Sequence, residues 1–93
     1  MTLPVDYTEL NSVQRRKVRE DYVLIQKNLC WFCSTSLSKP PSSSVLSRHI
    51  NRKLFPIGFF KWPIHLHHDH KTGMTIGAVH SYCNAILWQY YNE

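Results

Sequence analysis

The chain has few acidic residues, no long apolar run and an odd number of cysteines. Its 93 residues include 6 Asp and Glu against 11 Lys and Arg, which gives a formal net charge of +5 at pH 7. No stretch approaches the roughly 18 consecutive apolar residues that a membrane-spanning helix needs. Residues 1–9 also lack the basic and apolar regions of a secretory signal. We therefore expect a cytoplasmic protein with no membrane partner.

Length and composition predict a single domain that covers residues 1–93. A hydrophobic content of 43% with 13% aromatic residues is typical of a globular chain and excludes a disordered tail. A domain of this size buries only about two thirds of the surface that its unfolded chain exposes. Its apolar core is therefore marginal, and we expect a cross-link, such as a structural metal site, to stabilise the fold.

The excess of positive charge favours a polyanionic partner, for which nucleic acid is the first hypothesis. The alternative is a basic surface that serves only solubility.

Three cysteines cannot form a closed set of disulfides, because one is always left over. Cys30 and Cys33 form a C-x-x-C pair, and His80 and Cys83 form a second pair with the same spacing. Two such pairs supply the four ligands of a tetrahedral structural zinc site, which would join the two ends of the chain. The alternatives are a redox-active Cys30–Cys33 pair and cysteines that act only as small core residues.

Residues 6–28 are predicted to be helical, with a break near Asn11 and Ser12. Their basic residues indicate either a phosphate-contacting face or a solvated face with ion pairs such as Arg16–Glu20. The predicted buried stripe of this helix consists of Val18, Tyr22, Ile25 and Leu29.

Residues 34–62 give only a weak indication of secondary structure, and the one element predicted there is a short helix at 45–54. The aromatic residues Phe59, Phe60 and Trp62 lie among basic ones, so they either stack on nucleobases or pack in the core. The remaining chain is clearer: it predicts strands at 64–68 and 74–79 and a helix at 81–91.

Four of the six histidines lie between His65 and His70. Alternation along the strand puts His67 on the face of His65 and His68 on the opposite face, and we expect His65 to be a strand-surface residue. One imidazole of this cluster can hold a divalent ion while a neighbouring neutral imidazole acts as a general base.

These motifs resemble a known family. The chain contains Cys30-Trp31-Phe32-Cys33, then His67-His68-Asp69-His70, then His80-Ser81-Tyr82-Cys83-Asn84. Their order is similar to that of the HNH (ββα-metal, His-Me finger) nucleases, and most of all to the phage recombination endonuclease VII family. The resemblance covers about two thirds of the chain, without residues 34–62, and implies the ββα-metal fold at 64–93, an N-terminal helix and zinc knuckles at 30–33 and 80–83.

The resemblance also implies a role for each matching residue. His68 aligns with the general base, His70 with a histidine at the scissile phosphate, and Asn84 with a metal ligand. His67 stands where endonuclease VII proteins have a metal-binding Asp, so Mn²⁺, Ni²⁺ or Zn²⁺ would serve as well as Mg²⁺. Residues 71–79 contain no Asn, the middle letter of HNH.

The function expected from this resemblance is a metal-dependent DNA endonuclease, either nicking or structure-directed, encoded by a phage and active in its bacterial host. Its partners would be DNA and either a second copy of the chain or a larger phage or host assembly. The alternative is a non-catalytic zinc module that binds DNA or protein. The predicted DNA-contacting residues are Arg15, Arg16, Arg19, Lys61 and Lys71.

Overall fold

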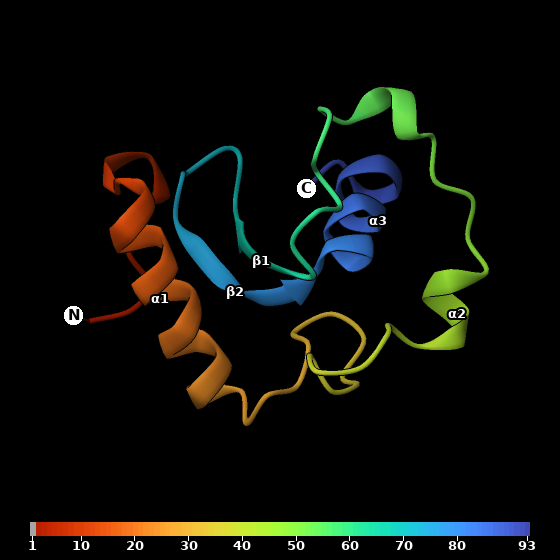
Figure 1. The fold of residues 1–93 in the computed structure, drawn as a ribbon. Helices are drawn as coiled ribbons and strands as arrows, with labels where there is room; N and C mark the ends of the chain where they lie inside the picture. The colour runs from red at the N-terminus through yellow and green to blue at the C-terminus, as the bar shows by residue number, and fades with distance from the viewer. Residues whose placement is uncertain (1) are drawn as a thin grey trace.

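The structure is a computed structural model that describes residues 2–93, so Met1 of the predicted domain lies outside the described residues. It is a small α+β fold with a two-stranded antiparallel sheet (Figure 1). In Figure 1, the first long helix lies on one side of the β-hairpin and the last helix on the other. The elements are the 3-10 helix η1 (Tyr7–Glu9), α1 (Ser12–Ile25), α2 (Ser43–Leu46), the 3-10 helix η2 (Arg52–Leu54), β1 (Ile64–His68), β2 (Thr75–His80) and α3 (Ser81–Tyr91).

The predicted N-terminal helix is interrupted where the sequence indicated, but it ends earlier than expected. Asn11 and Gln14 form a reciprocal capping box at the start of α1, so Asn11 caps this helix. The helix stops at Ile25, because Lys27 and Asn28 adopt the left-handed conformation with φ of 56° and 60°.

Half of the predicted buried stripe is wrong. Val18 and Tyr22 are buried, whereas Ile25 is 66% exposed and Leu29 is 44% exposed. Helical periodicity no longer applies beyond the left-handed residues, so Leu29 does not follow the face of Val18. Within residues 2–93 the ion pair on α1 is Lys17–Asp21, at 2.8 Å, rather than Arg16–Glu20.

The hairpin and the helix after it agree with the sequence to within one residue. β1 pairs antiparallel with β2, and α3 follows β2 without a loop. The register is regular from Ile64–His80 to His67–Gly77, but His68 then pairs with Thr75, which leaves one residue of β2 unpaired as a bulge.

The outer edge of β2 is covered by the end of α1. The Gln26 side chain accepts a hydrogen bond from Ala78 N at 2.9 Å and donates one to Ala78 O at 2.9 Å. A Cβ atom on Gly77 would come within 2.7 Å of Gln26 Oε1 and 3.1 Å of Trp31, so only glycine allows this close packing.

Residues 34–62 form no continuous helix at 45–54; α2 and η2 are separate short turns. Long-range contacts with α3 hold this segment in place. Gln89 Oε1 accepts from Asn51 N, and Tyr90 donates to the carbonyl of His49. The Arg52 guanidinium lies 4.4 Å from the Phe60 ring centroid and donates to the Tyr82 hydroxyl, so cation–π and hydrogen-bond contacts replace helical structure here.

The core lies where α1, the hairpin and α3 meet. Val18, Val79, Cys83 and Ile86 are fully buried there. Across residues 2–93, every helix is too short or too polar to cross a membrane.

Candidate metal cluster and histidine groove

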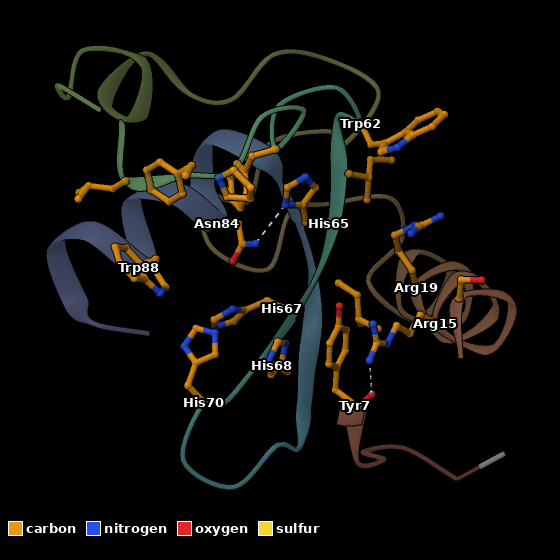
Figure 2. A pocket seen from close by; sticks show the side chains of 17 residues that line it. Tyr7, Arg15, Arg19, Trp62, His65, His67, His68, His70, Asn84 and Trp88 are labelled. Carbon is orange, nitrogen blue, oxygen red and sulfur yellow. Dashed lines mark hydrogen bonds between the residues drawn. The ribbon is translucent and has the colours of Figure 1, made fainter. Parts of the chain in front are cut away.

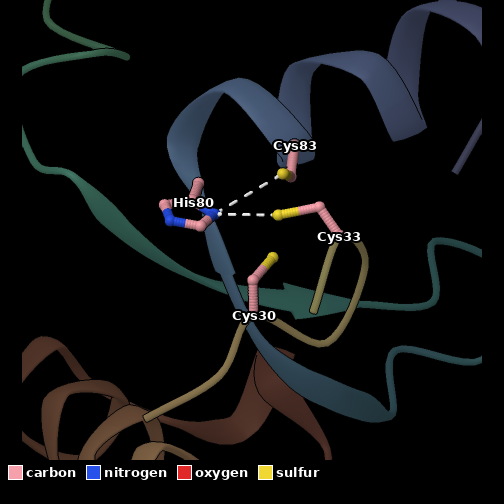
Figure 3. Close-up of side chains that lie close together, drawn as sticks. All are labelled: Cys30, Cys33, His80 and Cys83. Atoms are coloured by element: carbon pink, nitrogen blue, oxygen red, sulfur yellow. Dashed lines mark hydrogen bonds between the residues drawn. The ribbon is translucent and has the colours of Figure 1, made fainter. Parts of the chain in front are cut away.

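The first site is a compact cluster of the four predicted zinc ligands. One ligand atom from each of Cys30, Cys33, His80 and Cys83 lies within 4.8 Å of the other three (Figure 3). His80 Nδ1 is 3.5 Å from Cys33 Sγ and 3.6 Å from Cys83 Sγ. Thiolate and imidazole ligands on a tetrahedral zinc stand about 3.5 Å apart, so the cluster already has the spacing of a structural zinc site.

The local backbone explains how the four side chains converge. Cys30 and Cys33 lie in a tight turn, with the amide of Ser34 bonded to the carbonyl of Cys30 and Ser34 itself left-handed at φ 64°. His80 is the last residue of β2 and Cys83 lies in the first turn of α3.

The second ring nitrogen of His80 is also fixed. His80 Nε2 lies 2.9 Å from the carbonyl oxygens of both Ser36 and Lys39, which act as acceptors. Donation from Nε2 leaves the lone pair of Nδ1 directed at the sulfurs, which is the usual way in which a metal-binding histidine is oriented.

Protons are shared unequally among the thiols. A hydrogen bond from Cys83, opposed by burial, lowers the pKa of Cys30 to about 4. The same hydrogen bond and burial raise the pKa of Cys83 above its usual range. The pKa of Cys33 is lowered as well, because the effect of burial is outweighed by hydrogen bonds with Thr35. A metal ion would displace the protons that remain on the thiols.

The geometry favours this zinc site over the redox alternative. The Cys30–Cys33 pair lies in a turn rather than at the start of a helix, and Cys83 and His80 complete a four-ligand set around it.

The second site is an open groove of about 590 Å³ along β1. Its floor carries His65, His67, His68 and His70, and Asn84 of α3 reaches it from one side (Figure 2). The structure therefore brings together the four residues for which the sequence predicted catalytic roles.

His67 and His68 both line the groove, but their rings meet different neighbours. The His67 ring lies 5.7 Å from the Trp31 ring centroid, whereas the His68 ring stacks on Tyr7. The expectation that His65 is a strand-surface residue is wrong. His65 is half-buried in the groove, and its Nδ1 is 3.1 Å from Asn84 Nδ2.

His67 is the most deeply placed of these histidines, with 1% of its surface exposed. Its Nε2 has no hydrogen-bond partner among residues 2–93. Burial lowers the pKa of His67, so the imidazole is neutral near pH 7 and this nitrogen either carries an unused proton or offers a lone pair.

His68 is held by ring contacts. The Tyr7 ring stacks on it at 3.9 Å with an interplanar angle of 6°, and the His70 ring meets it edge-on at 4.8 Å. The guanidinium of Arg15 lies 3.9 Å from the Tyr7 centroid, and Figure 2 shows Tyr7 between the arginine and His68. Burial, together with the repulsion that positive charge on His70, His67 or Arg15 exerts, lowers the pKa of His68, so its ring is neutral near pH 7.

Tyr7 is a site residue that the sequence did not indicate. It reaches the groove because the N-terminal segment pairs with the hairpin turn: Tyr7 N donates to Gly73 O at 2.8 Å, and Thr75 N donates to Val5 O at 2.9 Å. Asp69 is not part of the groove floor, since its carboxylate accepts from the amides of Lys71 and Thr72 and closes the same turn. His65 and His67 are two residues apart on one strand, and this spacing alone indicates that His65 lies in the same site as His67.

Two of the predicted DNA-contacting residues, Arg15 and Arg19, line the groove. Arg16 is exposed on α1 outside it, and Lys71 is exposed on the hairpin turn. Lys61 extends over the Trp62 ring, 5.3 Å from its centroid.

Comparisons of this chain with known protein families, with curated proteins and with solved structures found no match.

Proposed function

We propose that the protein is a metal-dependent DNA endonuclease of the HNH type, in which β1, β2 and α3 form the ββα-metal unit. The observation that carries the proposal is the buried, unpartnered Nε2 of His67 in a groove shared with His68 and Asn84. A buried polar atom without a partner costs stability, and a catalytic role or a bound ion is one explanation for its retention.

The residues of the groove fit a catalytic divalent ion. His67 supplies a neutral imidazole nitrogen and Asn84 an amide oxygen, while the amide nitrogen of Asn84 is bonded to His65. This orientation turns the amide oxygen away from His65, so His65 serves as a positioning residue for Asn84. A mixed nitrogen and oxygen donor set favours Mn²⁺, Ni²⁺ or Zn²⁺ over Mg²⁺.

His68 is the proposed general base. Its ring is neutral near pH 7, and its stacking on Tyr7 fixes the plane in which its nitrogens lie. It would take a proton from the water that attacks the scissile phosphorus. A metal held by His67 and Asn84 would supply charge stabilisation to the leaving oxygen. Arg15 and Arg19 would hold the phosphates on the α1 side.

The test is nicking of supercoiled plasmid in the presence of Mg²⁺, Mn²⁺ or Ni²⁺. Wild-type protein is compared with His68→Ala, His67→Ala and Asn84→Ala, and the matched control is His49→Ala, since His49 is exposed outside the groove. We expect each groove variant to lose at least about 100-fold in rate and the control to keep wild-type activity.

Zinc content and the thermal midpoint of each variant establish that it is folded. Plasmid that stays intact with every metal, although the wild-type protein binds DNA, would replace the nuclease proposal with a non-catalytic zinc module. Equal activity of His68→Ala and wild type would remove His68 from the role of base.

A further inference from the structure

The groove has an aromatic wall that the proposed hydrolysis does not use. Phe55 and Phe59 pack together at 4.7 Å, and Trp88 of α3 contacts Phe55 at 5.6 Å with an interplanar angle of 65°. Trp62 lines the same groove. The phenylalanines are half-buried, but Trp62 is 65% exposed and Trp88 is 42% exposed.

This exposure is unexpected in a domain with so small a core. Burying a tryptophan contributes more apolar area than burying any other side chain, and the marginal core would gain from it. Two exposed indole rings in one groove instead indicate a surface that is covered when a ligand binds.

The charges around the wall define the ligand. Arg15 and Arg19 form the opposite side of the groove, and no Asp or Glu lies among the described residues that line it. A ligand complementary to both sides carries a flat aromatic group next to a negative charge. A nucleotide has this combination of groups.

We infer that the groove binds an unpaired nucleotide of a DNA strand, with its base stacked on Trp88 and its phosphates directed towards Arg15 and Arg19. The inference rests on the proposed nuclease function, whose groove it shares. Trp88 lies one helical turn after Asn84 on α3, so the two side chains share one face of the helix. The stacked base therefore lies beside the metal ligand and close to the scissile phosphate.

The same geometry discriminates against continuous duplex DNA. In a duplex both faces of each base are covered by its neighbours, so a base is available to Trp88 only when it is unpaired and unstacked. Arg15 and Arg19 would contact phosphates of single-stranded and of duplex DNA alike, so the preference for unpaired DNA depends on the aromatic wall.

The experiment uses the full chain with His68→Ala, which removes cleavage. Fluorescence anisotropy measures the dissociation constants of a labelled single strand and of the same sequence as a duplex at one fixed salt concentration. To this protein we add Trp88→Ala, Trp88→Phe or, as a control, Tyr91→Ala, because Tyr91 is 51% exposed and lies outside the groove.

We expect Trp88→Ala to weaken single-strand binding by at least about fivefold and duplex binding by less than about twofold. Trp88→Phe should keep most of the single-strand affinity, and Tyr91→Ala should bind both DNAs like the parent. An equal loss for single strand and duplex, or no loss for either, would overturn the inference.

A second measurement needs no substitution at Trp88. Stacking of a base on an indole quenches its fluorescence, so the single strand should quench the His68→Ala protein more than the duplex does. Equal quenching would also overturn the inference. These binding results stand apart from the plasmid assay: a protein that cuts no DNA but binds single strands through Trp88 refutes the nuclease and keeps the nucleotide site.

Discussion

The two sites of this protein use histidine in opposite ways. His80 is buried in the Cys₃His cluster, and its Nε2 contacts two carbonyl oxygens while its Nδ1 faces the sulfurs. His67 is buried just as deeply, yet its Nε2 has no partner among residues 2–93. A structural metal site fills every coordination position from the protein, whereas a catalytic site keeps positions open. His80 therefore has both ring nitrogens engaged, whereas His67 leaves one free in the part of the chain that the structure describes, and this difference matches the structural role proposed for the cluster and the catalytic role proposed for the groove.

The largest effect is expected when one of the four ligands of the Cys₃His cluster is removed. Cys83→Ser removes a ligand that has none of its surface exposed, and we expect the protein to lose both zinc and its cooperative fold. A structural zinc contributes about 10–16 kcal/mol in small zinc domains, which exceeds the whole stability of most domains this size. Zinc content and the far-UV circular dichroism melt measure the outcome.

The control for that experiment is His70→Ala, because His70 is exposed in the groove. This variant should keep zinc and its thermal midpoint. A Cys83→Ser protein that still melts cooperatively at the wild-type midpoint would show that the cluster does not hold the fold.

A second variant removes the unpartnered ring nitrogen of His67 from the groove. His67→Leu replaces a buried unpartnered nitrogen with an apolar side chain, and we expect the free energy of unfolding to rise by about 1 kcal/mol. Nicking activity should fall by at least about 100-fold in the same variant. Denaturant unfolding and the plasmid assay measure the two effects, with His49→Leu as the exposed control.

Gain of stability with loss of activity is the result that distinguishes a functional histidine from a structural one. A loss of stability in His67→Leu would mean that the ring makes contacts that the core requires, and would remove the contrast with His80.

A third variant, whose expected effect is on stability alone, concerns the connection between the turn before the cluster and β2. Gln26 joins the turn before the cluster to β2 through hydrogen bonds with Leu29 O at 2.7 Å and with both backbone atoms of Ala78 at 2.9 Å. Gln26→Ala should lower the free energy of unfolding by about 1–3 kcal/mol and leave zinc bound. The exposed control Lys17→Ala should leave the urea midpoint unchanged, although it removes an ion pair. Equal midpoints for both variants would show that β2 is held by other contacts.

The parts of this structure that sequence reasoning predicted are those fixed by local spacing. The two Cys and His pairs, the strands of the hairpin and α3 follow from short-range patterns, and their residues lie where expected. Residues 34–62 were not predictable in this way, because Arg48 and Arg52 hold the segment through contacts with Tyr90 and Tyr82 of α3. Contacts between residues that are distant in the sequence produce no periodic pattern of residue types.

One residue of the groove was missed for a similar reason. Tyr7 lies there because the N-terminal segment pairs with the hairpin, through the hydrogen bond from Thr75 N to Val5 O. This pairing has no signature in the local sequence around Tyr7. The alternation of side chains along β1 describes β1 alone, whereas other segments of the chain also line the groove.

The separation of the four residues of the Cys₃His cluster into two distant pairs has a consequence for engineering. Cys33 and His80 are 47 positions apart, and the chain between them includes the exposed stretch from Ser47 to His49. A cut in that stretch gives two fragments that each carry half of a coordination sphere, and neither half holds a tetrahedral ion alone. Reassembly of the fragments would therefore depend on zinc, and the split protein would act as a zinc-gated association pair.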